Sequence, residues 1–427
     1  MTSFDPYILR KEFPYFAHES AVWLDNAANT QKPQAVLDRV LLSLARASTV
    51  HRAVYALAEE ATLVYEEARS ILARFISAPS KDEVIFTNGT TGAINLFARS
   101  LYLSGKRAGR QGFRIVTSVL EHHSNYLPWR MLADEPGVEI IIIGHDGLGI
   151  DMEALAKALS APCDLVALSL CSNVSGAWLD SQQAAKLARA AGAVLFLDAA
   201  QAVLHRAICL DDSVALPAGG IRVAADALAF SGHKMYGPDG TGALWVRGDL
   251  LQDLVPVTFG GEMVRSVDDS AIDLQPPPRR FEAGTPNCSA ILGFAEAARW
   301  LLQSPRDEFR AHEEGLGRML HDELSALPGA RLYSVPGPLI SFTLDGWHTH
   351  DLALFLDREG LCLRAGRLCA EPFMRALGVP ALVRASLAAY TTREDCMRLV
   401  RALTLAKAAI PGRACLARFA RDSASMH

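Results

Sequence analysis

The feature that most constrains the fold of this sequence is the alternation of short apolar runs with longer helix-like stretches. Seven apolar runs fall between residues 83 and 246, and stretches such as Asp151–Leu159 and Ser181–Ala190 separate some of them. Such alternation predicts an α/β fold in which parallel strands are joined by crossover helices, with ligands bound at the carboxyl ends of the strands. The predicted strands are Glu83–Thr87, Arg114–Ser118, Val138–Gly144, Asp164–Ser169, Ala193–Asp198, Ala225–Phe230 and Gly242–Val246.

A proline-rich segment divides this pattern. Residues 274–280, LQPPPRR, contain three consecutive prolines, which neither a helix nor a central strand accommodates. We predict an N-terminal segment (1–20) that packs with the small domain, a large domain (21–273) and a smaller α/β C-terminal domain (274–427). Within the large domain, Val36–Phe75 is helical in character, because it is rich in Ala and Glu and contains no Gly or Pro. Asp211–Gly220 is predicted to be a loop that interrupts the alternation of strands and helices.

Composition argues against several classes of protein. Half of the 427 residues are hydrophobic, which is incompatible with intrinsic disorder, and the net charge of −5 argues against a nucleic-acid binder. No apolar run is long enough to span a membrane, and the N-terminal residues lack the pattern of a secretion signal. The eight cysteines form no CxxC pair, so we predict no metal site and expect a reducing, cytoplasmic location.

Two charged residues follow predicted strands of the large domain. Lys234 lies in SGHKMYGP, directly after the run Ala225–Phe230, and Asp198 ends the run Ala193–Asp198. Lys234 is either a solvated loop lysine or a Schiff-base nucleophile, because a desolvated lysine loses its proton readily. Asp198 is either the N-cap of a following helix or a carboxylate that pairs with a protonated pyridine nitrogen. The two residues are 36 positions apart, so their side chains can project from neighbouring strand ends.

Two further segments follow strands in the same way. Residues Asn88–Gly92, NGTTG, open a helix-like stretch and indicate either an ordinary helix cap or a cradle for a phosphate group. His122 and His123 are adjacent, a spacing that does not suit chelation of one metal ion, so an imidazole stacked on an aromatic cofactor or carrying a proton is the better interpretation. A lysine, an acid, a phosphate cradle and a stacking histidine together predict pyridoxal 5'-phosphate (PLP).

The chain resembles the type II cysteine desulfurases and selenocysteine lyases of the Suf/Csd kind, which are class V aminotransferase relatives and fold-type I PLP enzymes. The resemblance implies a large domain with a mostly parallel seven-stranded sheet and a smaller α/β C-terminal domain. It covers nearly the whole chain, in order. The motifs that carry it are WLDNAANTQKP (23–33), VHRAVYALAEEA (50–61), VIFTNGTTGAINL (84–96), EHHSNYLPW (121–129), SNVSG (172–176), DAAQAVLH (198–205), SGHKMYGPDGTG (231–242), FEAGTPN (281–287), RAGRLCAEP (364–372) and VRASLAAYTTRED (383–395).

The resemblance assigns a role to each cofactor-binding position. It implies that Lys234 carries PLP, that Asp198 pairs with its ring nitrogen and that His122 stacks on the ring. It also implies that Gln201 bonds the phenolic oxygen of the cofactor. The phosphate group is expected to be held by Thr90, Thr91, Ser231, His233 and, from the partner subunit of a homodimer, Thr285.

The substrate side of the site is implied in the same way. Asn173, Arg364 and Arg384 are expected to face the substrate, with Arg384 as the bidentate clamp on its α-carboxylate. The family also implies a homodimer whose active sites are completed across the interface with His51 and Arg52.

Cys369 is the expected nucleophile that takes sulfur from L-cysteine, forms a persulfide and passes the sulfur to an acceptor protein. It lies in the Gly/Pro-bounded segment RAGRLCAEP, near two arginines that would favour its thiolate. The chain departs from the family in having Arg367-Leu368 where two histidines are common, and Asn88 and Gly92 where Arg and Glu are usual. The alternative activities are those of a selenocysteine lyase or of another class V aminotransferase, epimerase or β-lyase.

Overall fold

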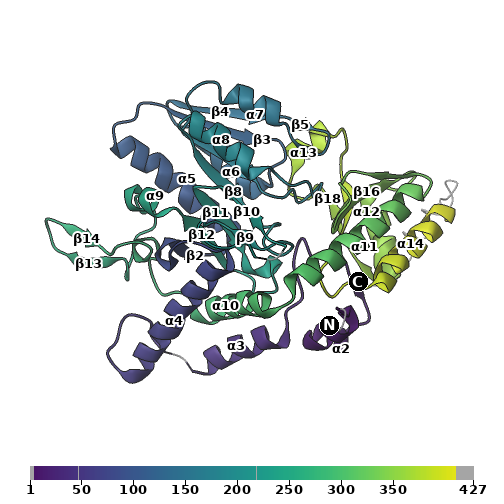
Figure 1. Cartoon of the computed structure of the whole chain (residues 1–427), viewed down its shortest axis with the longest axis horizontal. Helices are drawn as coiled ribbons and strands as arrows, with labels where there is room; N and C mark the ends of the chain where they lie inside the picture. The colour runs from purple at the N-terminus through teal and green to yellow at the C-terminus, as the bar shows by residue number, and fades with distance from the viewer. Residues whose placement is uncertain (1–3, 47, 218, 410–427) are drawn as a thin grey trace, which may run out of the picture.

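The central feature of the fold is a seven-stranded sheet in the large domain (Figure 1). The structure, a computed structural model, describes residues 4–46, 48–217 and 219–409. Strand β12 runs antiparallel to both of its neighbours, and the other strands are parallel to one another, so the prediction of a mostly parallel sheet is confirmed. In spatial order the strands are β2 (Val84–Thr87), β12 (Gly242–Val246), β11 (Ala227–Ser231), β8 (Val194–Asp198), β7 (Leu165–Ser169), β3 (Phe113–Ser118) and β4 (Val138–Ile143).

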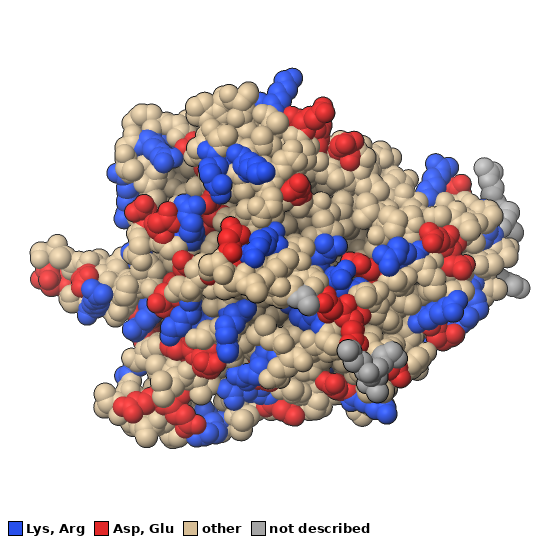
Figure 2. Space-filling view, viewed as in Figure 1, with Lys and Arg blue, Asp and Glu red and all other residues tan. Residues whose placement is uncertain are grey.

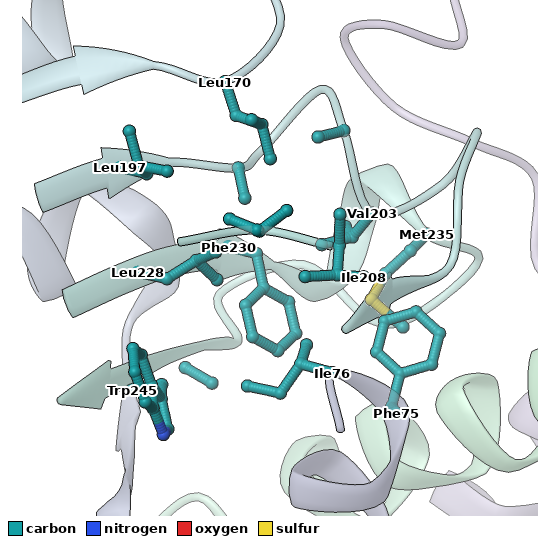
Figure 3. Close-up of a cluster of buried hydrophobic side chains, with 14 of the residues drawn as sticks. Phe75, Ile76, Leu170, Leu197, Val203, Ile208, Leu228, Phe230, Met235 and Trp245 are labelled. Carbon is teal, nitrogen blue, oxygen red and sulfur yellow. The ribbon is translucent and has the colours of Figure 1, made fainter. Parts of the chain in front are cut away.

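Both faces of this sheet are covered, as parallel strands require. Alternate side chains of β11 point to opposite faces: Ala227 and Ala229 join one buried cluster, and Leu228 and Phe230 join another. Figure 3 shows the second cluster, in which Phe230 lies between the sheet and Ile76. The helices that pack against the sheet include α5 (Gly89–Arg107), α6 (His123–Leu132), α7 (Met152–Ala158), α8 (Ser181–Ala190), α9 (Gly248–Asp253) and α4 (Ala56–Phe75).

The stretch predicted to be helical throughout, Val36–Phe75, is two helices, so that prediction is wrong. Helix α3 (Gln34–Ala45) ends at Ala45, and α4 begins only at Ala56. His51, in the connection, has φ 62, a left-handed conformation in which a right-handed helix cannot continue. The absence of Gly and Pro therefore did not guarantee a continuous helix.

The C-terminal part of the chain has its own sheet and its own core. Each of its four strands is antiparallel to its neighbours, in the order β15 (Ala330–Leu332), β16 (Leu339–Leu344), β19 (Leu382–Ser386) and β18 (Arg364–Gly366). Helices α11 (Arg306–Ala326), α12 (Thr349–Arg358) and α14 (Arg393–Ala408) contribute side chains to that core. Short helix α13 (Glu371–Ala376) begins two residues after Cys369, with Ala370 at its N-cap position.

Two segments make contacts across the predicted boundary between the large domain and the C-terminal domain. Helix α10 (Cys288–Gln303) packs on α3 and α4, and its Phe294 belongs to the core of the large sheet. At the other end of the chain, β1 (Val22–Trp23) pairs with β17 (Leu361–Cys362), and Arg10 donates a hydrogen bond to the carbonyl of Tyr390. We propose a division in which α10 counts with the large domain, while the N-terminal segment bridges the two.

The remaining elements are short. A hairpin of β13 (Val264–Val267) and β14 (Ile272–Leu274) projects from the body of the protein at the left of Figure 1. No helix among the described residues is long and apolar enough to cross a membrane. The other short elements are α1 (Pro6–Leu9), α2 (Tyr15–His18), β5 (His145–Asp146), β6 (Gly149–Ile150), β9 (Ile208–Cys209) and β10 (Ile221–Arg222).

The surface carries charges of both signs. Across the face shown in Figure 2, Lys and Arg side chains lie among Asp and Glu side chains. Exposed ion pairs among the described residues include Arg74 with Glu67 at 3.0 Å. Pairs of this kind contribute little to stability, because water already solvates both partners.

Arg69 on α4 differs, because its ion pair is buried. Its side chain is fully buried, with a guanidinium nitrogen 2.7 Å from Glu282 and another hydrogen bond to the carbonyl of Val84. We expect Arg69→Met to lower the free energy of unfolding by about 3–5 kcal/mol, because it leaves the Glu282 carboxylate without its buried partner. Urea unfolding of the cofactor-free protein measures this. The control Arg74→Met, in the exposed pair, should cost less than about 1 kcal/mol, and equal losses in the two variants would contradict the account.

Candidate active site

A cavity of about 230 Å³ lies where the carboxyl ends of the central strands meet the C-terminal sheet. Every site residue predicted from the sequence lines it except His51, Arg52 and Thr285. Asp198 and Ser231 end β8 and β11, and Arg384 reaches the cavity from β19 of the second sheet. The full lining is Ala27, Ala28, Thr90, Thr91, His122, Ser124, Ser169, Cys171, Asn173, Asp198, Ala200, Gln201, Ser231, His233, Lys234, Arg364, Leu368, Cys369 and Arg384.

Lys234 ends a single 3₁₀ turn that directly follows β11. The turn is tightly packed: a Cβ atom added to Gly232 would lie 2.3 Å from the hydroxyl oxygen of Thr241. Desolvation in the cavity lowers the pKa of the Lys234 ammonium to about 8, although Asp198 opposes the shift. About a tenth of Lys234 is therefore unprotonated at pH 7, far more than of an ordinary lysine, and this neutral form is able to act as a nucleophile or base.

Asp198 is buried and caps no α-helix. One of its carboxylate oxygens accepts a hydrogen bond from the backbone N–H of Ala200 at 2.9 Å, and the segment that follows forms turns. The helix-cap interpretation of Asp198 is therefore wrong. Burial raises the pKa of the Asp198 carboxyl, while the Ala200 N–H and Lys234 oppose the rise. A cationic group placed in the cavity would stabilise the ionised form of this buried carboxyl, so the two are expected to pair.

The anion end of the cavity is the start of α5. Asn88 occupies the N-cap position but makes no side-chain capping bond, so the ordinary side-chain cap does not occur here. The Thr90 N–H donates to the Ser231 hydroxyl at 2.8 Å, and the hydroxyls of Thr91 and Ser124 lie 2.7 Å apart. Hydroxyls gathered at the N-terminus of a long helix are suited to a phosphate group.

Of the neighbouring residues Glu121 and His122, His122 lines the cavity, whereas Glu121 is buried in a network of hydrogen bonds. His122 lines the cavity, and its Nδ1 accepts a hydrogen bond from the Ser124 N–H. Burial, with Lys234 close by, lowers the pKa of the imidazole to about 3, so the ring is neutral. Glu121 is fully buried and accepts hydrogen bonds of 2.6 Å from Ser118, Asn125 and Ser169, and burial raises its pKa to about 7.

Arg384 is a buried guanidinium whose Nε–H is not used by the described protein. It donates to the carbonyl of Asn173 at 2.9 Å and to Asp25 at 3.3 Å, whereas its Nε has no hydrogen-bond partner among the described residues. Burial lowers the pKa of Arg384, and Asp25 opposes the shift. A buried, unpaired N–H that belongs to a cavity-lining arginine is the donor that a carboxylate needs.

Cys369 is exposed, and it shares the cavity wall with Lys234 and Arg384. It is preceded by Leu368, and both residues have left-handed backbones, with φ 52 and 51. Of the two nearby arginines, Arg364 lines the cavity, whereas Arg367 forms an exposed ion pair with Glu371. The positive groups that interact electrostatically with the thiol are Lys234 and Arg384, which the sequence did not place beside it.

His51, Arg52 and Thr285 lie together, away from the cavity of their own chain. Arg52 donates to the Thr285 hydroxyl at 3.2 Å and forms an ion pair with Glu262. The His51 Nε2 lies 3.2 Å from a carboxylate oxygen of Glu66. Among the described residues, no group of three or more His, Cys, Asp or Glu could hold a metal ion.

Comparison with known proteins gives a consistent result. The profile of the aminotransferase class-V family matches residues 22–399. A cysteine desulfurase of Pectobacterium atrosepticum is 37% identical over 408 residues, which cover 92% of this chain and 96% of the relative. The structure of the Escherichia coli cysteine desulfurase CsdA, in its S-sulfonic acid form, superposes with a TM-score of 0.85 at 32% identity and covers 95% of this chain and 99% of that one.

A more distant structure shares the fold alone. It is the C-DES protein with glycine covalently linked to PLP, and it matches with a TM-score of 0.78 at 19% identity, over 92% of this chain and 98% of that one. The resemblance predicted from the sequence motifs is confirmed.

Proposed function

Because the chain belongs to the aminotransferase class-V family, we propose that it is a PLP-dependent cysteine desulfurase, which converts L-cysteine to L-alanine and leaves the sulfur on Cys369. The observation that carries the assignment of residues is that Lys234, Asp198, Arg384 and Cys369 all line one cavity. A lysine base, a buried acid, a carboxylate clamp and a thiol are the groups that this reaction needs.

The residues of the cavity fit PLP. The hydroxyls of Thr90, Thr91 and Ser231 at the start of α5 suit the phosphate group, and His233 lies beside them. Neutral His122 suits stacking on the ring, Asp198 suits the ring nitrogen and Gln201 suits the phenolic oxygen. When it is bound, the cofactor withdraws electrons from the bonds at the substrate Cα.

The protein side chains divide the remaining work. The Arg384 guanidinium binds the α-carboxylate of the substrate, and its free Nε supplies a donor that the protein does not use. Lys234 takes the proton from the substrate Cα and returns one to form alanine. The Cys369 thiolate attacks the sulfur atom of the substrate, so that a sulfur–sulfur bond forms as the carbon–sulfur bond breaks. Cys369 is exposed, and this lets a sulfur-acceptor protein collect the sulfur.

The proposed function is tested by product analysis with L-cysteine and a thiol reductant. Cysteine desulfurase activity gives equal amounts of L-alanine and sulfide. Pyruvate with ammonia would indicate a β-lyase, a 2-oxo acid without sulfide an aminotransferase, and D-cysteine an epimerase. Turnover of L-selenocysteine without turnover of L-cysteine would indicate a selenocysteine lyase. Each of these other results would overturn the proposal.

The state of Lys234 predicts how cofactor loading depends on pH. The neutral amine is the form that reacts with the PLP aldehyde, and a lysine with a pKa of about 8 is roughly 10% neutral at pH 7 and roughly 90% neutral at pH 9. The rate of reconstitution of cofactor-free protein should therefore rise about tenfold between these pH values and then level off. The appearance of the PLP absorbance band measures it. A rate that still rises tenfold between pH 9 and 10 would contradict the lowered pKa.

We also propose that the protein is a homodimer that pairs through α3 and α4. Helix α3 exposes Leu41 (63%) and Leu44 (62%), and α4 exposes Leu63 (72%), a large apolar area for a free surface. Arg52, in the connection between α3 and α4, contacts Thr285, so a second copy seated here would meet the residues that the family uses across its interface.

The expected effect of a charge in this surface is loss of the dimer. We predict that Leu41→Asp combined with Leu63→Asp gives a monomer in sedimentation, because two carboxylates would be desolvated in the interface. Leu354→Asp on α12, which replaces a leucine with 62% exposure, should leave the dimer intact. A dimeric double variant would refute this interface.

A reducing, cytoplasmic location agrees with the thiols. The seven cysteines among the described residues are all free, and Cys369 must remain a thiol to act. The eighth cysteine, Cys415, lies outside the described residues.

A further inference from the structure

The nucleophile Cys369 is carried by a turn whose backbone is strained. Leu368 and Cys369 have φ 51 and 52, and Gly366 has φ 121. Consecutive residues with side chains rarely adopt the left-handed conformation, and they keep it only where the surroundings hold them. Contacts from outside the turn must therefore fix the direction in which the thiol points.

The backbone of the turn is held by groups from the large domain. The amide nitrogen of Asn173 donates to the carbonyl of Leu368 at 2.8 Å, and the backbone N–H of His123 donates to the carbonyl of Cys369 at 2.7 Å. The Leu368 side chain is also buried, in a cluster that contains Leu120 and Val174 of the large domain.

The side chain of His123 makes a second contact, two residues beyond Cys369 in the chain. Its Nε2 accepts a hydrogen bond from the backbone N–H of Glu371 at 3.2 Å. Glu371 is the first residue of α13, and Ala370, at the N-cap position, makes no capping bond with its own side chain. His123 therefore supplies from another domain the acceptor that the start of α13 lacks.

His123 thus contacts the chain both at Cys369 and two residues beyond it. His123 follows His122, which lines the cavity, and precedes Ser124, whose hydroxyl bonds Thr91 at the phosphate end. One short segment therefore contacts the cofactor cavity and the turn that carries the nucleophile. We propose that His123 is a positioning residue, which holds the Cys369 turn so that the thiol faces the substrate sulfur; this inference rests on the proposed function.

A positioning role predicts a specific kinetic effect. Removing the Nε2 acceptor frees the Glu371 end of the turn but leaves Arg384 and the carboxylate site unchanged. A misplacement of a reacting group by about 1 Å can cost about 10²-fold in rate. His123→Leu should therefore lower kcat for alanine formation from L-cysteine by about tenfold or more, with KM within about twofold of the wild type.

Two further variants separate positioning from a general loss of stability. His123→Gln keeps an acceptor near the position of Nε2 and should restore kcat to within about threefold. His145→Leu is the matched control, because the His145 ring also contacts α13, through Phe373 at a centroid distance of 5.6 Å, whereas its one side-chain hydrogen bond among the described residues is to Gly147. It should have the kcat of the wild type.

The test compares these variants as PLP-loaded proteins and adds hydrogen–deuterium exchange of the peptide that contains Glu371. The inference expects faster exchange at Glu371 in His123→Leu and protection restored in His123→Gln. Unchanged kcat in His123→Leu, failure of glutamine to restore it, or an equal loss in His145→Leu would overturn the inference. If the wild type forms no alanine, the proposed function fails, whereas unchanged exchange at Glu371 would refute the contact that His123 is inferred to make.

Discussion

Replacing Cys369 by serine is expected to reduce alanine formation from L-cysteine by on the order of 10³-fold, because a hydroxyl cannot replace the thiolate in the attack on sulfur. PLP should remain bound, since Cys369 lies at the exposed side of the cavity and belongs to none of the groups that would hold the cofactor. Alanine release and the cofactor absorbance, measured on the same sample, separate loss of the nucleophile from loss of the cofactor.

A second thiol in the same cavity provides the control. Cys171 also lines the cavity, but it is buried, and burial raises its pKa to about 12, so it carries almost no thiolate. Cys171→Ala should keep activity within about threefold of the wild type. If Cys369→Ser remains active while Cys171→Ala is inactive, the two thiols have been assigned the wrong way round.

Replacing Lys234 by alanine is expected to lower turnover by about 10²–10⁴-fold or more, because the reaction loses its base as well as the amine that attaches the cofactor. Lys234→Arg should be equally inactive, since an arginine keeps the positive charge but does not give up its proton near neutral pH. Reduction with borohydride should fix PLP to the wild type and to neither variant.

The exposed Lys186→Ala on α8 is the control for this experiment, and it should behave as the wild type. Substantial alanine formation by Lys234→Arg would show that another group moves the proton at the substrate Cα. In that case Lys234 would not be the base of the reaction, although its pKa is lowered.

The sequence predicted the parts of the site that depend on local rules. Asp198, Lys234 and Thr90 each follow an apolar run, and parallel strands bring their carboxyl ends to one edge of a sheet, so these side chains meet in one cavity. The antiparallel direction of β12 could also have been predicted from the sequence. Only residues 232–241 separate it from β11, and a parallel crossover needs a dozen or more residues.

Other features depend on contacts between distant parts of the chain. Arg384 donates a hydrogen bond to Asp25, which lies 359 positions away in the sequence, and no local sequence pattern predicts that pairing. Strand β18 has three residues, too few to show a period of two. The left-handed pair Leu368 and Cys369 is invisible in the sequence as well, because neither residue type prefers that conformation and the large domain imposes it.

The central claim is that Cys369 takes the sulfur atom of L-cysteine. The most direct test is a single turnover of the PLP-loaded wild type with L-cysteine in the absence of reductant, followed by mass spectrometry of its peptides. The account predicts that the peptide containing Cys369 gains the mass of one sulfur atom and that an equal amount of L-alanine is released. Release of L-alanine with no added sulfur on Cys369, or with the sulfur on another cysteine, would contradict it.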